Sequence, residues 1–346
     1  MIQHITLWID RPYLDSFLYS GALFLLDMDG VLTSYDWQRV VSQVLGAHGR
    51  EELMPLFLDS RQPRALSEQD HGLVLEVPND ILRDAATSSI GWKVWPTDLN
   101  IYANNIYISD ESGAYVASFE YASKSIDRDS IRNIRSGYIY SIAPGDGGRL
   151  AIASAESGLS LLILNGQEKP LIEDDIFDCD WFGTSLVANS QEHSYLARFS
   201  PLPKREQFED TQDFFASMRH AKNADPTTAR LDAAGQSEYR WLAGQDVIDE
   251  VNQAIGTQSD DSRVIKARSA SFGSIIERLD RLVLQRSDSQ QTLDISKPIF
   301  WRTFSRSKNY LNHLHVCSHN GMQIRAYDTA TRESDRFAVE LSDFEI

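Results

Sequence analysis

One hairpin near the N-terminus decides the fold, and residues 22–36 spell it as ALFLLDMDGVLTSYD. Two apolar runs flank a short turn at residues 27–30 that ends in Gly30. Glycine after a polar residue supplies the positive φ angle of a tight turn, and alternation of apolar with polar residues marks a strand with one buried face. The stretch therefore predicts two antiparallel strands joined by that turn.

The same pattern returns along the chain. Clear copies read IYISDESGAYVASFE at 106–120, LAIASAESGLSLLIL at 150–164 and HVCSHNGMQIRAYD at 315–328, and less regular copies surround turns at 190–193 and 287–290. The turns that start at 110, 155 and 190 recur at about the 40–50-residue period of propeller blades. We predict an all-β fold over residues 1–346: a single β-propeller domain of about seven four-stranded blades, within a range of six to eight.

These repeats resemble those of the WD-repeat and related β-propeller superfamily. Residues 30–36 and 321–328 are similar to the strand of that superfamily that follows an Asp-Gly turn and ends in an aromatic residue and Asp. The Trp-Asp pair and the Gly-His start of a standard WD repeat do not occur. The resemblance implies a platform that binds other macromolecules on its faces and rim. We expect the strand at 336–341 to close it by pairing near residues 5–9, because closure removes exposed sheet edges.

Composition restricts the partners of this protein. Lys and Arg number 33 against 50 Asp and Glu, which gives a net charge of −17. A field of that sign opposes nonspecific binding to nucleic acid and to anionic membranes. The two cysteines have no close spacing and the first residues form no basic leader, so we expect a cytoplasmic setting. A glycine-rich phosphate loop does not occur, and no cofactor is expected.

Helical patterns interrupt the repeats at about 36–60, 204–222 and 245–255. Such insertions either pack on the flank of the propeller or dock a partner, and repeat insertions often map to a binding face. Asp36 is a candidate N-cap for the first helix. The docking interpretation predicts a partner-binding set of apolar side chains: Trp37, Leu56, Phe57, Phe208 and Phe215.

An enzymatic alternative begins at the same turn. Residues 24–33 are similar to the first motif of the haloacid dehalogenase phosphatases, in which the resemblance implies Asp27 as nucleophile, Asp29 as acid and base, and Mg²⁺ between carboxylates. That fold needs parallel strands joined by helices, whereas residues 100–200 read as consecutive hairpins. The simpler interpretation makes residues 27–30 one hairpin turn among several.

Two further clusters have residue types that carry chemistry. His313, His315, Cys317 and His319 alternate, so a strand would place these possible zinc ligands on one face. Alternate residues lie about 6.6 Å apart along a strand, so at most two would reach one ion, and no metal site is predicted. Residues 301–310 interleave basic and aromatic side chains, which suits contact with an acidic partner or, less well, with nucleic acid.

The sequence thus predicts a noncatalytic protein-interaction scaffold, a subunit of a multiprotein assembly whose partners are other protein subunits. Two alternatives remain open. The first is the magnesium-dependent phosphatase that uses Asp27 and Asp29. The second is a propeller enzyme whose site residues come from several blades and leave no local motif. Function in such folds depends on surfaces, which short motifs do not identify.

Overall fold

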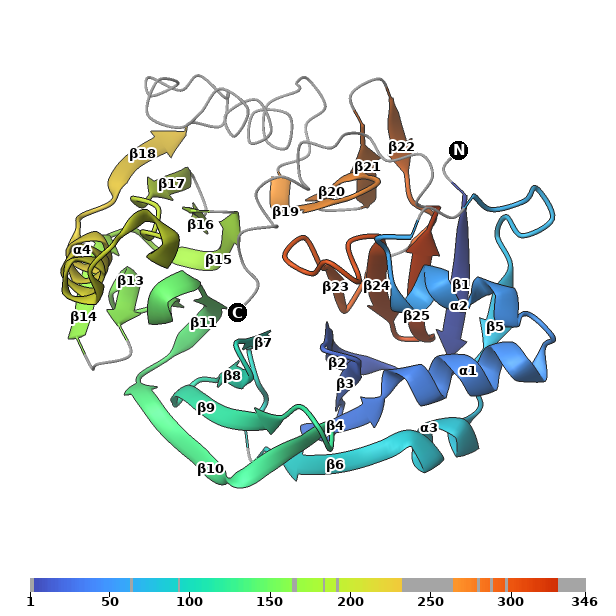
Figure 1. Cartoon of the computed structure of the whole chain (residues 1–346). Helices are drawn as coiled ribbons and strands as arrows, with labels where there is room; N and C mark the ends of the chain where they lie inside the picture. Colours follow the sequence, from blue (N-terminus) through green and yellow to red (C-terminus); the bar gives the residue numbers. More distant parts are fainter. Residues whose placement is uncertain are drawn as a thin grey trace. The chain divides into compact units, whose positions relative to one another are not determined.

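The computed structural model describes residues 3–62, 65–92, 94–163, 167–182, 184–190, 193–231, 264–278, 281–286, 289–295 and 298–328. These residues form six sheets of four or five strands each (Figure 1), the blades of a β-propeller. The predicted fold is confirmed, with six blades in the described part of the chain.

The first three sheets follow one another along the chain. The first contains β2 (Tyr13–Tyr19), β3 (Ala22–Asp27), β4 (Val31–Asp36) and β6 (Ala86–Gly91). The second contains β7 (Asp98–Tyr102), β8 (Asn105–Ser109), β9 (Gly113–Glu120) and β10 (Ser125–Ser136). The third contains β11 (Ile139–Pro144), β12 (Arg149–Ser154), β13 (Gly158–Ile163) and β14 (Gln167–Ile172).

The remaining sheets include the one that joins the two ends of the chain. The fourth contains β15 (Ile176–Phe182), β16 (Ser185–Ser190), β17 (Ser194–Arg198) and β18 (Thr227–Leu231). The fifth contains β19 (Val264–Ala270), β20 (Gly273–Arg278), β21 (Leu282–Gln285) and β22 (Gln290–Thr292). The sixth has the order β23 (Phe300–Thr303), β24 (His313–Ser318), β25 (Gly321–Tyr327), β1 (His4–Ile9) and β5 (Val74–Glu76).

Helices occupy the connections between strands. They are α1 (Trp37–Ala47), α2 (Met54–Leu58), α3 (Asn79–Ala85) and α4 (Thr211–Asn223), with short 3₁₀ turns at Glu51–Leu53, Asp146–Gly148 and Arg205–Gln207. Asp36 caps α1 as predicted, because its side chain accepts a hydrogen bond from the Arg39 amide. Residues 245–255, where a further helix was predicted, lie outside the described residues. In the described part of the chain, no helix is both long and apolar enough to cross a bilayer.

Each hairpin found in the sequence lies in a different sheet. Four of them form the two middle strands of a four-stranded sheet, as β3 and β4 do in the first sheet, and a fifth forms the inner strands β24 and β25 of the five-stranded sixth sheet. The copy around 287–290 instead joins β21 to the edge strand β22, which explains its short distance from the next hairpin. The segment near Leu75 contributes β5 to the sixth sheet.

Glycine is required at the turns for two different reasons. Gly30 has a φ of +75°, a conformation that side-chain-bearing residues rarely adopt. At Gly321 an added Cβ would lie 2.5 Å from the Trp8 ring and 2.6 Å from the Ile9 carbonyl oxygen. The hairpin between β24 and β25 therefore needs glycine so that β1 can approach it closely.

The first strand, β1, completes the sixth sheet. It pairs antiparallel with β25, from His4 opposite Tyr327 to Ile9 opposite Met322, and its other edge pairs in parallel with β5. Both edges of β1 are thus occupied by described strands. Residues 336–341, which were expected to pair near residues 5–9, lie outside the described part of the chain. The early strand does pair with a late one, but the late one is β25.

Backbone contacts divide the chain into two compact units, and a single domain over residues 1–346 stays a prediction. One unit comprises 1–106, 116–132 and 260–346, and the other comprises 107–115 and 133–259. The core of the first unit combines side chains from β1, β2, β3, β24 and β25 with those of α1, α2 and α3. A second core lies among the third and fourth sheets in the other unit.

Leu7 tests the importance of β1. It is fully buried between Ile324 and Leu75, its neighbours on the two adjacent strands. Leu7→Ala should lower the free energy of unfolding by about 2–5 kcal/mol, the usual cost of a buried Leu-to-Ala cavity. Val74→Ala is the control, because Val74 in β5 is 60% exposed and should change stability by less than about 0.5 kcal/mol. Equal effects in urea denaturation would contradict this account of β1.

Candidate functional site

Three of the predicted partner-binding residues are core residues. Trp37, Leu56 and Phe57 are at most 1% exposed and belong to the main core of the first unit. A docking role needs accessible side chains, so their assignment to a partner-binding surface is wrong. The apolar side chains of this insertion face the core that they share with the sheets.

Polar contacts hold this insertion in place around the short helix α2. The indole Nε1 of Trp37 donates to the Phe57 carbonyl oxygen at 3.0 Å. The side-chain amide of Asn312 donates to the Leu56 carbonyl at 2.9 Å and to the Tyr327 carbonyl at 3.0 Å. The short helix α2 is thereby fixed to the loop before β24 and to β25, and the carbonyl groups of Leu56 and Phe57 have hydrogen-bond donors.

Asp27 and Asp29 lie in a hairpin turn rather than at the end of a parallel strand. The carboxylate of Asp27 accepts hydrogen bonds from the amides of Asp29 at 3.0 Å and Val31 at 2.9 Å. Asp110 makes the same kind of turn, because its carboxylate accepts from the Gly113 amide at 2.9 Å. The strands on either side of Asp27 pair antiparallel, so the parallel sheet that the phosphatase alternative requires is absent here, and that alternative is wrong.

The histidine-rich strand β24 is buried on both sides. His313, His315 and Cys317 are all inaccessible to solvent, whereas His319 lies exposed in the following turn. Burial raises the pKa of the Cys317 thiol to about 11, so the thiolate that binds zinc is disfavoured. Among the described residues, no group of three or more His, Cys, Asp or Glu side chains is arranged to hold a metal ion.

Aromatic rings surround the two buried histidines. The ring centre of His313 lies 5.5 Å from that of Tyr310, 6.0 Å from that of Phe57 and 6.4 Å from that of Trp37. Nδ1 of His315 lies 2.6 Å from the Ser16 hydroxyl oxygen. Burial lowers the pKa of His313 to about 3, and the nearby Leu56 carbonyl opposes this effect only in part. Both rings are therefore neutral packing elements at neutral pH.

This burial predicts a loss of stability in acid. Below about pH 6.5 the unfolded chain protonates His313, whereas the folded chain does so only near pH 3, so the free energy of unfolding falls as the pH falls through that window. At pH 5 the free energy of unfolding should be about 2 kcal/mol lower than above pH 6.5, because each pH unit in this window costs about 1.4 kcal/mol. In the His313→Phe variant this contribution is absent. The free energy of unfolding, measured by urea denaturation between pH 7 and pH 4, should therefore fall less steeply as the pH falls. Identical slopes for the two proteins would contradict the burial of a neutral imidazole.

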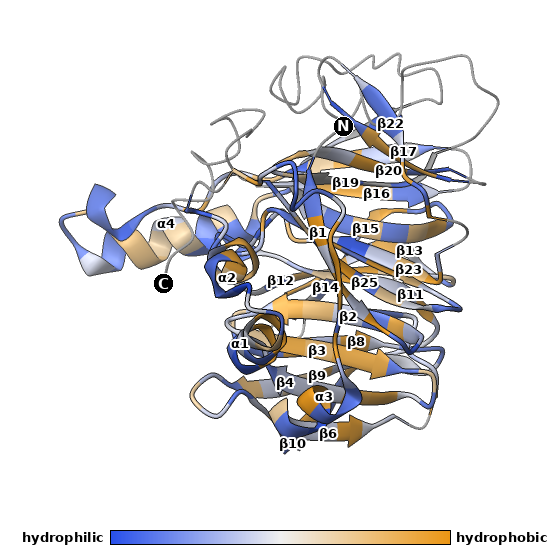
Figure 2. Cartoon of the chain, turned by 90° about the vertical axis from the view of Figure 1, so that its right-hand side faces the viewer, coloured by the Kyte–Doolittle hydropathy of each residue, from blue (hydrophilic) through white to orange (hydrophobic). Residues whose placement is uncertain are grey.

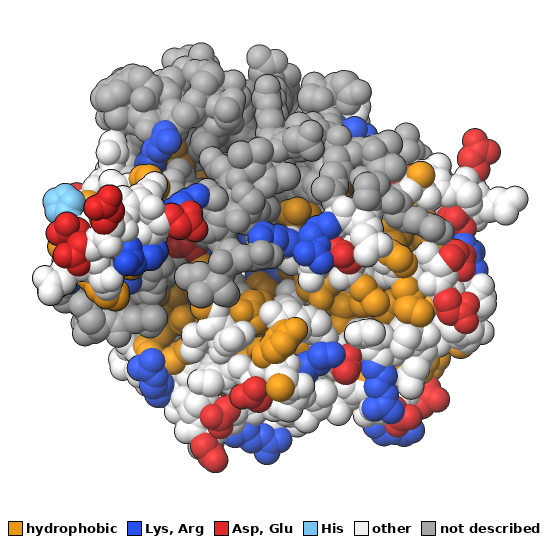
Figure 3. Space-filling view, in the orientation of Figure 1, with side chains coloured by type: hydrophobic (Ala, Val, Ile, Leu, Met, Phe, Trp, Pro, Cys, Tyr) orange, Lys and Arg blue, Asp and Glu red, His pale blue; other side chains and the backbone are white. Residues whose placement is uncertain are grey.

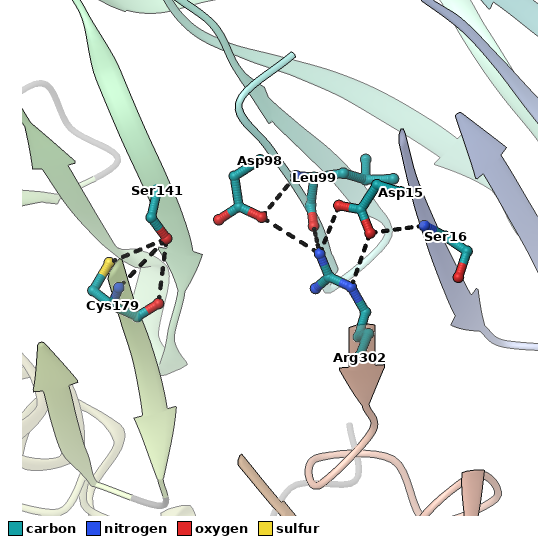
Figure 4. A network of polar contacts seen from close by, with 7 residues as sticks. All are labelled: Asp15, Ser16, Asp98, Leu99, Ser141, Cys179 and Arg302. Carbon is teal, nitrogen blue, oxygen red and sulfur yellow. Dashed lines mark hydrogen bonds and ion pairs between the residues drawn. The ribbon is translucent and has the colours of Figure 1, made fainter. Parts of the chain in front are cut away.

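A charged network joins the first strands of three sheets (Figure 4). Arg302 on β23 donates to Asp15 Oδ2 on β2 at 2.8 Å and to the Leu99 carbonyl on β7 at 2.8 Å. It also lies 3.4 Å from an Asp98 carboxylate oxygen and stacks over the Phe17 ring at 4.9 Å. Since one guanidinium group satisfies partners from two other sheets, the network fixes the spacing of their first strands.

The basic stretch at 301–310 is thus not a free basic surface. Trp301 is buried and its Nε1 donates to Glu277 at 2.6 Å, while Arg302 is neutralised by Asp15. Sequence reasoning missed the network because its members are far apart along the chain. The one available signal was Asp15, an acidic residue inside a mostly apolar strand. In the other unit, a neutral hydrogen bond joins β11 to β15, because the Cys179 amide donates to the Ser141 hydroxyl at 3.4 Å (Figure 4).

Arg302 should matter more than a surface arginine. Arg302→Met leaves the largely buried carboxylate of Asp15 without its partner, and we expect the free energy of unfolding to fall by about 3 kcal/mol. Arg11→Met is the control, because Arg11 pairs with Asp27 while 50% exposed, and such pairs contribute about 1 kcal/mol or less.

A double-mutant cycle completes this test. Asp15→Asn added to Arg302→Met should cost less than the sum of the two single changes, because each removes the same interaction. Additive losses would show that the network is not a coupled unit.

The remaining two predicted partner-binding residues lie at a surface helix. Phe215 on α4 is 55% exposed, and Phe208 just before the helix is partly exposed. In Figure 2, α4 projects beyond the sheets beside it, with hydrophilic ends and a more apolar middle. Only Ala221 of this helix is buried. Partner binding by Phe208 and Phe215 stays a prediction, with geometry that allows it.

Contacts at its C-terminal end hold α4 in place. The guanidinium group of Arg149 donates to the Ala221 carbonyl at 2.8 Å and stacks over the Phe199 ring at 4.8 Å. A cation at this end also suits the helix dipole. At the other end, Phe214 contacts Phe208 and Phe215 with ring centres 5.8 and 5.4 Å away. The fold thus fixes one end of α4 and presents aromatic rings at the other.

Comparison with known proteins finds only distant structural likeness. Neither the protein-family models nor the curated proteins include a match to this chain. Among solved structures, the WD40 domain of Neurospora crassa Pan2 is 7% identical, with a TM-score of 0.45 over 92% of this chain and 89% of that one. The N-terminal domain of Nup159 is 7% identical, with a TM-score of 0.46 over 95% and 96%. PorZ of Porphyromonas gingivalis is 12% identical, with a TM-score of 0.40, and the chain spans 29% of its length.

Proposed function

We propose that this protein is a noncatalytic interaction subunit, a β-propeller that docks another protein of a multiprotein assembly at the surface around α4. The observation that supports this most directly is the 55% exposure of Phe215 on a helix with a single buried residue. Exposed aromatic side chains commonly anchor protein interfaces, because they bury a large area at a small cost in conformational entropy.

The arrangement of α4 suits docking better than a loop would. An isolated helix of 13 residues is only marginally stable in water. Here the Asp210 side chain caps the first turn at 2.7 Å from the Gln212 amide, and Arg149 holds the last turn. A binding surface that is ordered before the partner arrives loses less entropy on association.

The net charge of −17 supports protein partners over nucleic acid or an anionic membrane surface. We place this activity in the cytoplasm, where the two buried thiols, Cys179 and Cys317, would stay reduced. The alternative of a propeller enzyme with a dispersed site has no group of described residues that favours it.

Replacement of the two aromatic residues tests this proposal. Phe208→Ser combined with Phe215→Ser should reduce recovery of a specific co-purifying protein at least tenfold from the native host, because the partner loses its aromatic anchors. The melting temperature should fall by no more than a few degrees, since neither side chain is buried.

Tyr121→Ser is the matched control, because Tyr121 is 61% exposed in the first unit. It should leave co-purification unchanged. A double variant that co-purifies with the same proteins in the same amounts as the wild type would show that the α4 surface is not the docking site.

A further inference from the structure

Charge is divided along α4. Glu209, Asp210 and Asp213 lie at its N-terminal end, whereas Arg219, His220 and Lys222 lie near its C-terminal end. Within the described part of the chain, Asp213, Arg219 and Lys222 take part in no ion pair. Figure 3 shows acidic and basic side chains together over α4, at the left of the view. The helix dipole favours this order of charges, but among the described residues Asp213, Arg219 and Lys222 have no ion-pair partner.

The outward face has the spacing of a helix-packing surface. Gln212, Asp213, Ala216, Arg219 and His220 are all exposed and recur at intervals of three and four residues. Ala216 is the small central residue of this face, which allows another helix to approach closely. Phe215 borders the same face and supplies apolar surface for burial.

A second copy of this chain complements that face. Dimers with twofold symmetry use the same patch on both subunits. In an antiparallel pair centred on Ala216, Asp213 of each copy lies opposite Arg219 of the other, and the acidic end of each helix faces the basic end of its partner. A helix with one charge type at each end is complementary to itself in this orientation only.

The charge of the rest of the chain favours contact at this place. Two copies with a net charge of −17 each repel one another over most of their surface. Residues 204–223 contain four acidic and four basic residues, so this segment is locally neutral. Contact through α4 therefore meets less repulsion than contact through an average patch.

We propose that α4 of one copy pairs antiparallel with α4 of a second copy, which makes this chain a weak symmetric dimer. The proposal goes beyond the proposed function, because it assigns the outward face of α4 to a second copy of this chain. A helix of 13 residues is about 20 Å long. One such pair buries less than the roughly 1,200 Å² of a stable interface, so we expect dissociation in the micromolar range.

Sedimentation velocity of the full chain, from about 1 to 200 μM, tests the dimer. The wild type should shift from monomer to dimer across that range. Asp213→Arg and Arg219→Asp should each raise the dissociation constant at least tenfold, because each variant opposes like charges. An equimolar mixture of the two variants should restore wild-type association, since the new base of one chain then faces the new acid of the other.

Asp80→Arg is the matched control, a charge reversal at an exposed position of α3, and it should leave association unchanged. Circular dichroism checks that each variant is folded. A wild type that stays monomeric overturns the dimer, as does a dimer that survives both reversals or a mixture that fails to associate. A monomeric wild type leaves the proposed function intact. That function is tested separately, by the amount of other proteins that co-purify with the double variant Phe208→Ser and Phe215→Ser.

Discussion

The pairing of β1 with β25 is the contact on which the first unit depends most. It joins residues at opposite ends of the described chain, in a continuous register from His4 opposite Tyr327 to Ile9 opposite Met322. Ile5, Leu7 and Ile9 are at most 1% exposed as a result. Without this pairing, β25 would be an edge strand with unpaired amide and carbonyl groups, which is a site for aggregation.

Much of the segment between β4 and β6 packs against this same sheet. The edge of β1 is covered by β5 in parallel pairing, and the Leu66 amide donates to Asp328 at 3.0 Å. The helices α1 and α2 then cover the core that β1 and β25 share with β24. A segment that looked in sequence like an added docking element is therefore part of what makes the first unit stable.

Local turn chemistry explains which parts of the fold could be predicted. The six hairpins named in the sequence could be found because a polar turn and its flanking alternation lie within about fifteen residues of one another. The partner of β1 could not be found in this way, because register between distant strands depends on packing. The same reason hid the Arg302 network, whose partners Asp15 and Leu99 are 287 and 203 residues away. Burial of His313 was missed because the helices that cover it are also distant in sequence.

The insertion that contains α4 differs from the one that contains α1 and α2, because it adds little to the core of the sheet beside it. Residues 199–226 separate β17 from β18, yet the two strands pair in unbroken register from Ser194 opposite Leu231 to Arg198 opposite Thr227. The entropy cost of closing a loop rises only slowly with its length, so an edge strand tolerates an inserted helix. Ala221 is the buried residue of α4. Substitutions on the outward face of this helix can therefore change binding with little effect on the stability of the fold. That separation lets a propeller acquire a binding surface without any change in its blades.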